Sequence, residues 1–332
     1  MSKKILVLIA ATISIFAIGC GKKNKDVITK LKNNVENLSA YHLKGELEII
    51  NNEDVYMYDI DVSYKENDLF RVSLKNINNN HIQILLKNSE GVYVLTPALN
   101  KSFKFQSDWP YNNSQIYLLQ TILKDILDDG NATVKETNNG YVITSKVNYS
   151  NNEDLVKQNV YIDDSSNIKT VEVMDADDNV LMRVTFTDIN TRPNFSDDYF
   201  ELNSSLNTSV TDEEVQSVSK IDSIIYPMYI PEKTYLSTQD KVNTDNGERI
   251  ILTFEGDNPF MLVQETSSKL SELTTIPMYG SPEMIGDTIG ALSDNSITWS
   301  SNGIDYYVTS SNLSEQELLS VANSINVLPV GK

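Results

Sequence analysis

The chain contains a long succession of short segments in which apolar and polar residues alternate. In the segment 55–64, VYMYDIDVSY, Tyr56, Tyr58, Ile60 and Val62 fall on one side, with Asp59, Asp61 and Ser63 on the other. A period of two predicts a β-strand with one buried face. Comparable segments recur over 41–105 and 133–190, separated by turns rich in Asn, Asp and Gly. An antiparallel sheet of this size must curl to bury its apolar face.

Two segments have helical spacing instead. Residues 26–41 place Val27, Leu31, Val35 and Leu38 on one helical face. Residues 114–130 predict a second helix, with Ser114 as its N-cap, Gly130 at its end, and an apolar stripe of Ile116, Leu119, Leu123, Ile126 and Leu127. The order is therefore helix, about six strands, helix and about five strands. It predicts a mainly β domain over 26–203, an incomplete antiparallel β-barrel whose concave side is covered by a helical lid.

Aromatic residues gather where the chain leaves the sheet for the lid. The strand ends at Phe105, a turn follows at Trp109-Pro110, and the helix then begins. Under one interpretation, Trp109 and Pro110 only pack the corner between sheet and helix. Under the other, the lid closes an apolar cavity that could hold a hydrophobic ligand. The candidate cavity and lid residues are Phe103, Phe105, Trp109, Tyr117, Leu119, Leu123 and Ile126.

The last third of the chain predicts a separate small α+β domain over 222–330, after a polar linker at 204–221. Segments 249–256 and 259–266 form one expected hairpin, and Asn302-Gly303 marks the turn of another. Ser314 and Glu317 fit a capping box that opens a closing helix, in which Leu318 and Leu319 face inward.

The first twenty residues have the parts of a bacterial secretion signal. Lys3 and Lys4 precede a short apolar run, and small Gly19 precedes Cys20, the only cysteine of the chain. The sequence Ala17-Ile18-Gly19-Cys20 resembles a lipobox. That resemblance implies removal of a signal peptide of residues 1–19, a diacylglycerol on the sulfur of Cys20, and a polar tether over 20–25. The alternative is an ordinary signal peptide, or a buried cysteine. The lipobox predicts a protein anchored by lipid on the extracytoplasmic face of the cell membrane.

Charge and composition exclude several classes of function. The formal net charge of −19 opposes contact with nucleic acid and with anionic lipid. One cysteine allows no internal disulfide, and the two histidines, His42 and His81, are too few for a His-rich zinc site. No glycine-rich phosphate loop follows a strand, and the paired carboxylates lie in predicted turns. The segment DADDN at 175–179 lacks the Gly and Glu of a calcium loop. We expect no cofactor, no metal site and no enzymatic activity.

The block VLTPALNKSFKFQSDWPYNNSQIYLLQTILKDIL, residues 94–127, together with the order of strands and helices, resembles the LolA/LolB superfamily of lipoprotein carriers. More narrowly, it resembles the YdcC-type sporulation lipoproteins of spore-forming Gram-positive bacteria, to which the germination lipoprotein GerS is related. The resemblance implies a half-barrel with a helical lid. In the LolA carriers the apolar hollow holds acyl chains.

Two functions remain open. The anchored half-barrel is expected to act as a scaffold for an envelope enzyme, such as a cortex-modifying amidase, as the resemblance implies. Alternatively, it carries lipid or lipoprotein acyl chains under the lid. The volume left inside the half-barrel distinguishes the two functions, because a hollow filled by its own side chains cannot carry a ligand.

Overall fold

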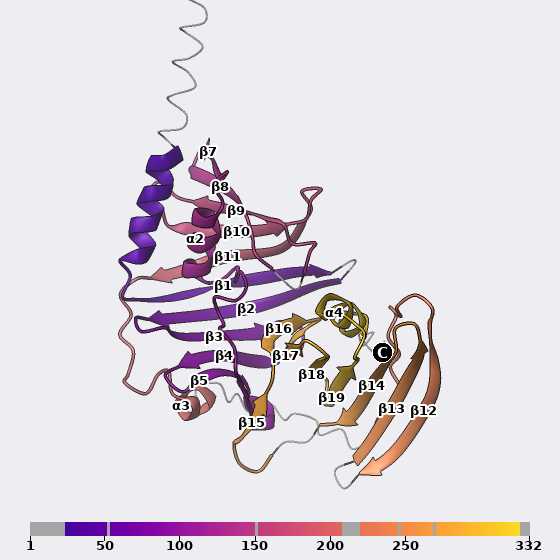
Figure 1. Ribbon diagram of the computed structural model, residues 1–332. Coiled ribbons are helices and arrows are strands. Elements are labelled where there is room, and N and C mark those ends of the chain that lie inside the picture. The colour runs from indigo at the N-terminus through magenta and orange to yellow at the C-terminus, as the bar shows by residue number, and fades with distance from the viewer. Residues whose placement is uncertain are drawn as a thin grey trace, which may run out of the picture.

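The computed structural model describes residues 24–51, 54–149, 152–207, 220–244, 247–267 and 270–325 (Figure 1). The described chain is mainly β and forms two sheets. The larger sheet has twelve strands in the order β15-β6-β5-β4-β3-β2-β1-β11-β10-β9-β8-β7. In chain order its strands are β1 (Ala40–Asn51), β2 (Asp54–Lys65), β3 (Leu69–Asn76), β4 (Ile82–Asn88), β5 (Gly91–Thr96), β6 (Lys101–Phe105), β7 (Thr133–Thr137), β8 (Gly140–Lys146), β9 (Lys157–Ile162), β10 (Ile168–Met174), β11 (Val180–Asn190) and β15 (Thr274–Met278).

The larger sheet is open, with β15 and β7 as its two edges, so the predicted incomplete barrel is confirmed. Its longest strands pair antiparallel over their full length, from Ala40 opposite Lys65 to Asn51 opposite Asp54. The register of β1 against β11 shifts between Lys44 and Gly45. A Cβ atom at Gly45 would lie 2.3 Å from a backbone oxygen of β11, so only glycine fits this irregularity. Bulges of this kind bend a strand and increase its twist.

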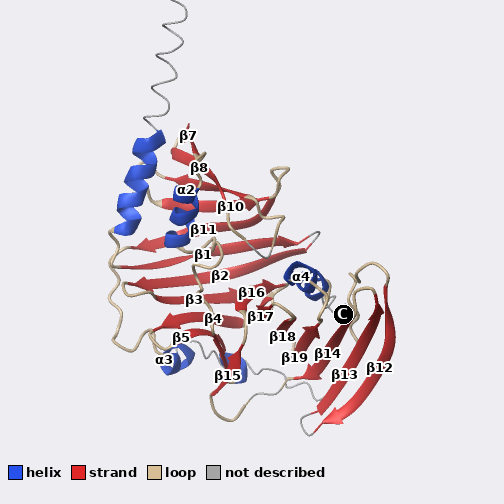
Figure 2. Ribbon diagram, in the orientation of Figure 1, coloured by secondary structure: helices blue, strands red, loops and turns tan. Residues whose placement is uncertain are grey.

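Two helices cover one face of this sheet, as the sequence predicted (Figure 2). A helix at residues 24–36 and α2 (Leu119–Asp128) bury their apolar stripes in the same core as β1–β5 and β8–β11. Lys30 and Asn34 donate hydrogen bonds to carbonyl oxygens in the turn between β9 and β10, which fixes the first helix at the sheet. Gln158 of β9 donates to the Ile122 carbonyl of α2.

The predicted start of α2 is wrong. The helix begins at Leu119 after Leu118, and no side chain caps it. Ser114 lies upstream of the helix, and its hydroxyl accepts a hydrogen bond from the Asn148 N–H at 2.7 Å. Leu127 was expected on the buried stripe but is 42% exposed. The buried residues of α2 centre on Ile122, and Leu127, five positions later, lies about 140° around the helix from it.

The opposite face of the sheet is covered only locally. Strands β4 and β5 bury residues on both faces: Ile84, Leu86, Tyr93 and Leu95 form a separate cluster with Phe200 and Leu206. These last two residues belong to segment 195–207, which ends in α3 (Leu202–Asn207). The continuous apolar sequences of β4 and β5 are typical of strands buried on both sides.

The smaller sheet has seven strands in the order β12-β13-β14-β19-β18-β17-β16. They are β12 (Thr234–Thr244), β13 (Gly247–Gly256), β14 (Phe260–Thr266), β16 (Ser281–Ile285), β17 (Thr288–Ser293), β18 (Ser296–Ser301) and β19 (Ile304–Thr309). Both predicted hairpins are present, and Asn302 and Gly303 have positive φ angles, as their turn requires. Helix α4 (Glu315–Asn323) opens with the predicted capping box of Ser314 and Glu317 and packs on this sheet.

The chain passes from one sheet directly into the other. Strand β15 pairs parallel with β6 at the edge of the larger sheet, although it lies within the segment expected to form the second domain. A short turn then leads into β16 at the edge of the smaller sheet. The division into domains at 26–203 and 222–330 stays a prediction. Strand β15 of the larger sheet and β16 of the smaller sheet are consecutive in the chain and connect the two sheets directly.

Buried polar side chains hold the two sheets together. The Gln83 amide of β4 is buried: it donates to the Ile289 carbonyl at 3.1 Å and accepts from the Ile289 N–H at 2.6 Å. The Thr288 hydroxyl also donates to Gln83, at 2.9 Å. Elsewhere along the junction, the Lys101 ammonium of β6 donates to Ser267 and to Asp305 of β19 at 2.9 and 3.0 Å.

We expect Gln83→Leu to lower the free energy of unfolding by about 2–4 kcal/mol, because it leaves the buried N–H and C=O of Ile289 without partners. Chemical denaturation of residues 21–332 measures this. The control is Gln106→Leu, since Gln106 is exposed and its replacement is expected to change stability by less than about 0.5 kcal/mol. Equal effects of the two substitutions would contradict the assigned role of Gln83.

Candidate functional site

The hollow between α2 and the larger sheet is filled by side chains. Phe105, Trp109, Leu119, Leu123 and Ile126 are all buried in the main core. The Trp109 ring meets the Phe70 ring edge-on, with centroids 6.0 Å apart. Phe103 is partly buried against the same core. Of the seven candidate residues from the sequence, only Tyr117 lines the cavity described next.

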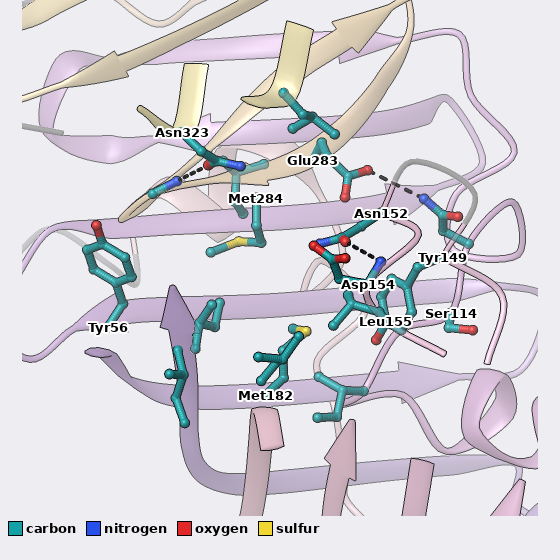
Figure 3. Close-up of a pocket in the computed structure, with 18 of the residues that line it drawn as sticks. Tyr56, Ser114, Tyr149, Asn152, Asp154, Leu155, Met182, Glu283, Met284 and Asn323 are labelled. Atoms are coloured by element: carbon teal, nitrogen blue, oxygen red, sulfur yellow. Dashed lines mark hydrogen bonds between the residues drawn. The ribbon is translucent and has the colours of Figure 1, made fainter. Parts of the chain in front are cut away.

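A cavity of about 710 Å³ lies beside the lid, at the junction of the two sheets (Figure 3). Its volume lies within the range of about 300–1,000 Å³ that is usual for ligand pockets. The lining combines segments that are far apart in sequence. They are the strands β1, β2, β4 and β11 of the larger sheet, the lid approach 113–117, residues 149, 152, 154 and 155, residues 228 and 229, and β16, β17 and α4 with the smaller sheet.

Apolar side chains from both sheets form much of the wall. The larger sheet contributes Leu47, Ile49, Leu85, Leu181 and Met182. The smaller sheet contributes Met284 and Ile289, and α4 contributes Leu319. Neither sheet alone would enclose the space. The contacts through Gln83, Lys101 and β15 therefore determine the shape of the cavity.

One part of the lining is polar and acidic. The Asn113 amide donates to Glu283 at 3.4 Å. Burial raises the pKa of Tyr117 and of Tyr149, and the nearby Glu283 carboxylate raises both further. Both phenols keep their hydroxyl proton at neutral pH, as an unperturbed tyrosine also does. A second carboxylate, Asp154, lines the exposed side of the cavity.

Among the described residues, no cationic side chain lines this cavity. The lining residues that the structure describes include two carboxylates, several amides and hydroxyls, and no Lys, Arg or His. This part of the site therefore offers acceptors for a positively charged or hydrogen-bond-donating group and no positive charge for an anion.

The histidines lie away from this cavity. The Nε2 atom of His42 is 2.9 Å from Asp61 Oδ1, on strands β1 and β2. Partial burial lowers the pKa of His81, and the nearby Asp287 opposes that shift. Within the described ranges, no group of three or more His, Cys, Asp or Glu residues is arranged to hold a metal ion.

The sequence did not identify the acidic end of the cavity. Glu283 and Met284 were not singled out because β16 was not predicted, and Asn323 was assigned only to the closing helix. Their common location depends on how the two sheets meet. The signal peptide at 1–19 and Cys20 lie outside the described residues. In the part of the chain that the structure describes, no helix has the length and apolarity needed to cross a membrane.

A buried carboxyl group lies behind the cavity. Burial raises the pKa of Asp125 on α2 from 3.8 to about 6, against the opposing effect of a hydrogen bond with Ser114, which itself lines the cavity. The neutral form of Asp125 is thus favoured by folding. This contribution is complete below about pH 4 and is lost as the pH rises through about 6.

We expect Asp125→Asn, which mimics the neutral carboxyl, to raise the free energy of unfolding by about 2–3 kcal/mol at pH 7.5 and by only about 0.5 kcal/mol at pH 4. Urea denaturation at the two pH values measures the difference. In the control Asp128→Asn, an exposed carboxylate paired with Lys124 is lost, and we expect a change under about 0.5 kcal/mol at either pH. A stabilisation by Asp125→Asn that is independent of pH would contradict the raised pKa.

Comparison with known proteins gives the family. A family model described as "Sporulation protein YdcC-like" matches residues 2–200. The chain is 32% identical to the sporulation protein YdcC of Bacillus subtilis (strain 168) over 327 residues, which covers 97% of each chain.

Two solved structures are more distant. A putative outer membrane lipoprotein-sorting protein domain from Vibrio parahaemolyticus has 11% identity and a TM-score of 0.34, and the match covers 56% of this chain and 99% of that one. A chain from the structure of the CwlD amidase of Clostridioides difficile in complex with the GerS lipoprotein has 18% identity and a TM-score of 0.23, over 49% of this chain and 93% of that one. On the evidence of the family model and the identity to YdcC, this chain belongs to the YdcC-like family of sporulation proteins.

Proposed function

We propose that this chain is a lipid-anchored sporulation protein that binds a partner protein at the extracytoplasmic face of the membrane and has no catalytic role of its own. The observation that carries the proposal is the filled hollow under α2. Trp109, Leu119, Leu123 and Ile126 are packed into the core, so side chains fill the space behind the lid in the described part of the chain. The cavity at the junction of the sheets is open and has a mixed polar and apolar lining.

The nature of the partner follows from the family and from the sequence. Membership of a sporulation family supports a role during spore formation. The resemblance of the lid block to GerS-related proteins makes a cortex-type amidase the first partner to test. A chain with a net charge of −19 favours a partner that presents basic residues.

We expect a photo-cross-linking amino acid in place of Met228 to capture the partner in sporulating cells. Met228 lines the cavity and is 89% exposed, so a partner bound there would contact it. The control carries the same amino acid in place of exposed Lys135 on the edge strand β7. Mass spectrometry identifies any adduct. Absence of an adduct at position 228, or the same adducts at both positions, would count against a partner at this site.

Lipid on Cys20 would hold the protein at the membrane, as the lipobox predicts. We expect Cys20→Ala to move the protein from the membrane fraction to the soluble fraction and to abolish incorporation of labelled palmitate. The reason is that stable anchoring requires two acyl chains, and their attachment requires the thiol. Fractionation with immunoblotting measures this, with the wild-type chain as control. Retention of the variant in the membrane fraction would disprove lipid anchoring through this residue.

A second candidate function is the carriage of lipid or lipoprotein acyl chains. It is favoured by the volume of the junction cavity, about 710 Å³, and by its apolar wall of Leu47, Ile49, Met182 and Met284. It is disfavoured by the carboxylates at positions 154 and 283, because a fatty acid would bring a further negative charge. Binding of a fluorescent fatty acid distinguishes the two candidates and forms part of the experiment below.

A further inference from the structure

We infer that the junction cavity recognises a peptide segment in which a Lys or Arg lies next to an apolar side chain. This inference rests on the proposed function, because it specifies the chemistry by which a partner protein would bind. Three features of the lining carry it: its charge, its methionines and its amides.

The charge of the lining selects a cation. Glu283 and Asp154 contribute carboxylates, and none of the lining residues in the described part of the chain is basic. The Glu283 carboxylate already accepts a hydrogen bond from Asn113. A carboxylate has about four acceptor positions, so Glu283 can still accept from an ammonium or guanidinium group. Such charge-assisted hydrogen bonds are about twice as strong as neutral ones.

The apolar wall is suited to side chains of variable shape. Met182, Met228 and Met284 all line the cavity, which is three of the eight methionines in the chain. Methionine is flexible and polarizable, and surfaces that accommodate different peptides use it frequently. Ile49 and Ile289 add fixed apolar surface from the two sheets.

The amides of the lining match the needs of a peptide backbone. They are Asn113 and Gln115 before the lid, Asn152, and Gln316 and Asn323 of α4. Three of the amide oxygens already accept one hydrogen bond within the chain: Gln115 from the Tyr117 hydroxyl, Asn152 from the Asp154 N–H and Asn323 from the Gly286 N–H. An amide oxygen has a second lone pair and the amide nitrogen carries two donors, so these groups can also satisfy backbone C=O and N–H groups that lose water on binding. An acyl chain has no use for these groups, and their burial under it would be unfavourable.

An apolar strip continues from the cavity onto the surface. Met228 and Tyr229 line the opening, and the flanking Tyr226 and Ile230 are also exposed. The Tyr226 hydroxyl donates to Gln239 of β12, which holds this strip against the smaller sheet. The strip gives a peptide that leaves the cavity a further apolar surface to follow.

The test compares two blocked peptides, acetyl-Leu-Lys-Leu-Lys-Leu-amide and acetyl-Leu-Glu-Leu-Glu-Leu-amide, by isothermal titration calorimetry with residues 21–332. We expect the lysine peptide to bind, and to bind more weakly as salt is raised. We expect the glutamate peptide to bind at least about tenfold more weakly. In a parallel arm, the fluorescent fatty acid cis-parinaric acid is titrated, and we expect no binding that Met284→Arg abolishes.

Variants then test whether the lysine peptide binds in the cavity. Glu283→Gln removes a lining carboxylate and is expected to weaken the lysine peptide about tenfold, as loss of a hydrogen bond to a charged group does. Met284→Arg introduces a cation and is expected to abolish binding, whereas Met284→Leu retains it. Glu232→Gln, an exposed carboxylate outside the lining, is the control and leaves binding unchanged. Circular dichroism melting confirms that each variant is folded.

The inference is overturned if the lysine peptide does not bind, if both peptides bind equally, or if Met284→Arg binds the lysine peptide as well as Met284→Leu does. Tight binding of cis-parinaric acid that is abolished by Met284→Arg would assign the cavity to lipid. The proposed function is tested separately: if position 228 captures no partner in cells, the proposal of a partner bound at this site is wrong. If capture occurs and is unaffected by Glu283→Gln and Met284→Arg, the partner binds by other chemistry and only the inference fails.

Discussion

The amide of Gln83 binds the backbone of the neighbouring sheet, and the candidate site depends on this contact. The side-chain oxygen of Gln83 accepts a hydrogen bond from the Ile289 N–H, and its side-chain nitrogen donates to the Ile289 carbonyl, as the backbone of a neighbouring strand would. Together with the parallel pairing of β15 with β6, it fixes the smaller sheet against the open side of the larger one. The cavity is the space left between the two sheets, and residues 113–117, 152, 154, 155, 228 and 229, which lie outside the strands, complete its wall.

Most of the larger sheet follows from the alternation of apolar and polar residues, because that alternation directly records which face of a strand is buried. The lid helix was also found, but its start was misplaced. Ser114 has the residue type of an N-cap, yet its hydroxyl is engaged by the backbone of Asn148, and the helix starts at residue 119. This hydrogen bond joins residues 34 positions apart and overrides the preference of Ser114 for an N-cap position. The residues around Ser114 do not indicate it.

The position of the cavity could not be predicted from the sequence. Local pattern identifies which residues are apolar, and the lid stripe of Leu119, Leu123 and Ile126 was correctly recognised as buried. Whether a buried stripe lines a hollow or fills it depends on the distance between helix and sheet. Strand β15 has an unremarkable sequence, TTIPM, with a proline that argues against a central strand, so its pairing at the edge of the larger sheet could not be anticipated.

The contrast between the filled hollow and the open cavity distinguishes two parts of the interior. Under α2, the space is filled by Trp109 and the lid residues at close packing. At the junction with the second sheet the space is open, and amides and carboxylates join its apolar wall. Of the residues that line it, Glu283, Gln316 and Asn323 are not part of the main apolar core, so substitutions there would change the lining without removing a core side chain. The proposed function therefore assigns binding to a wall whose chemistry can change independently of the core of the half-barrel.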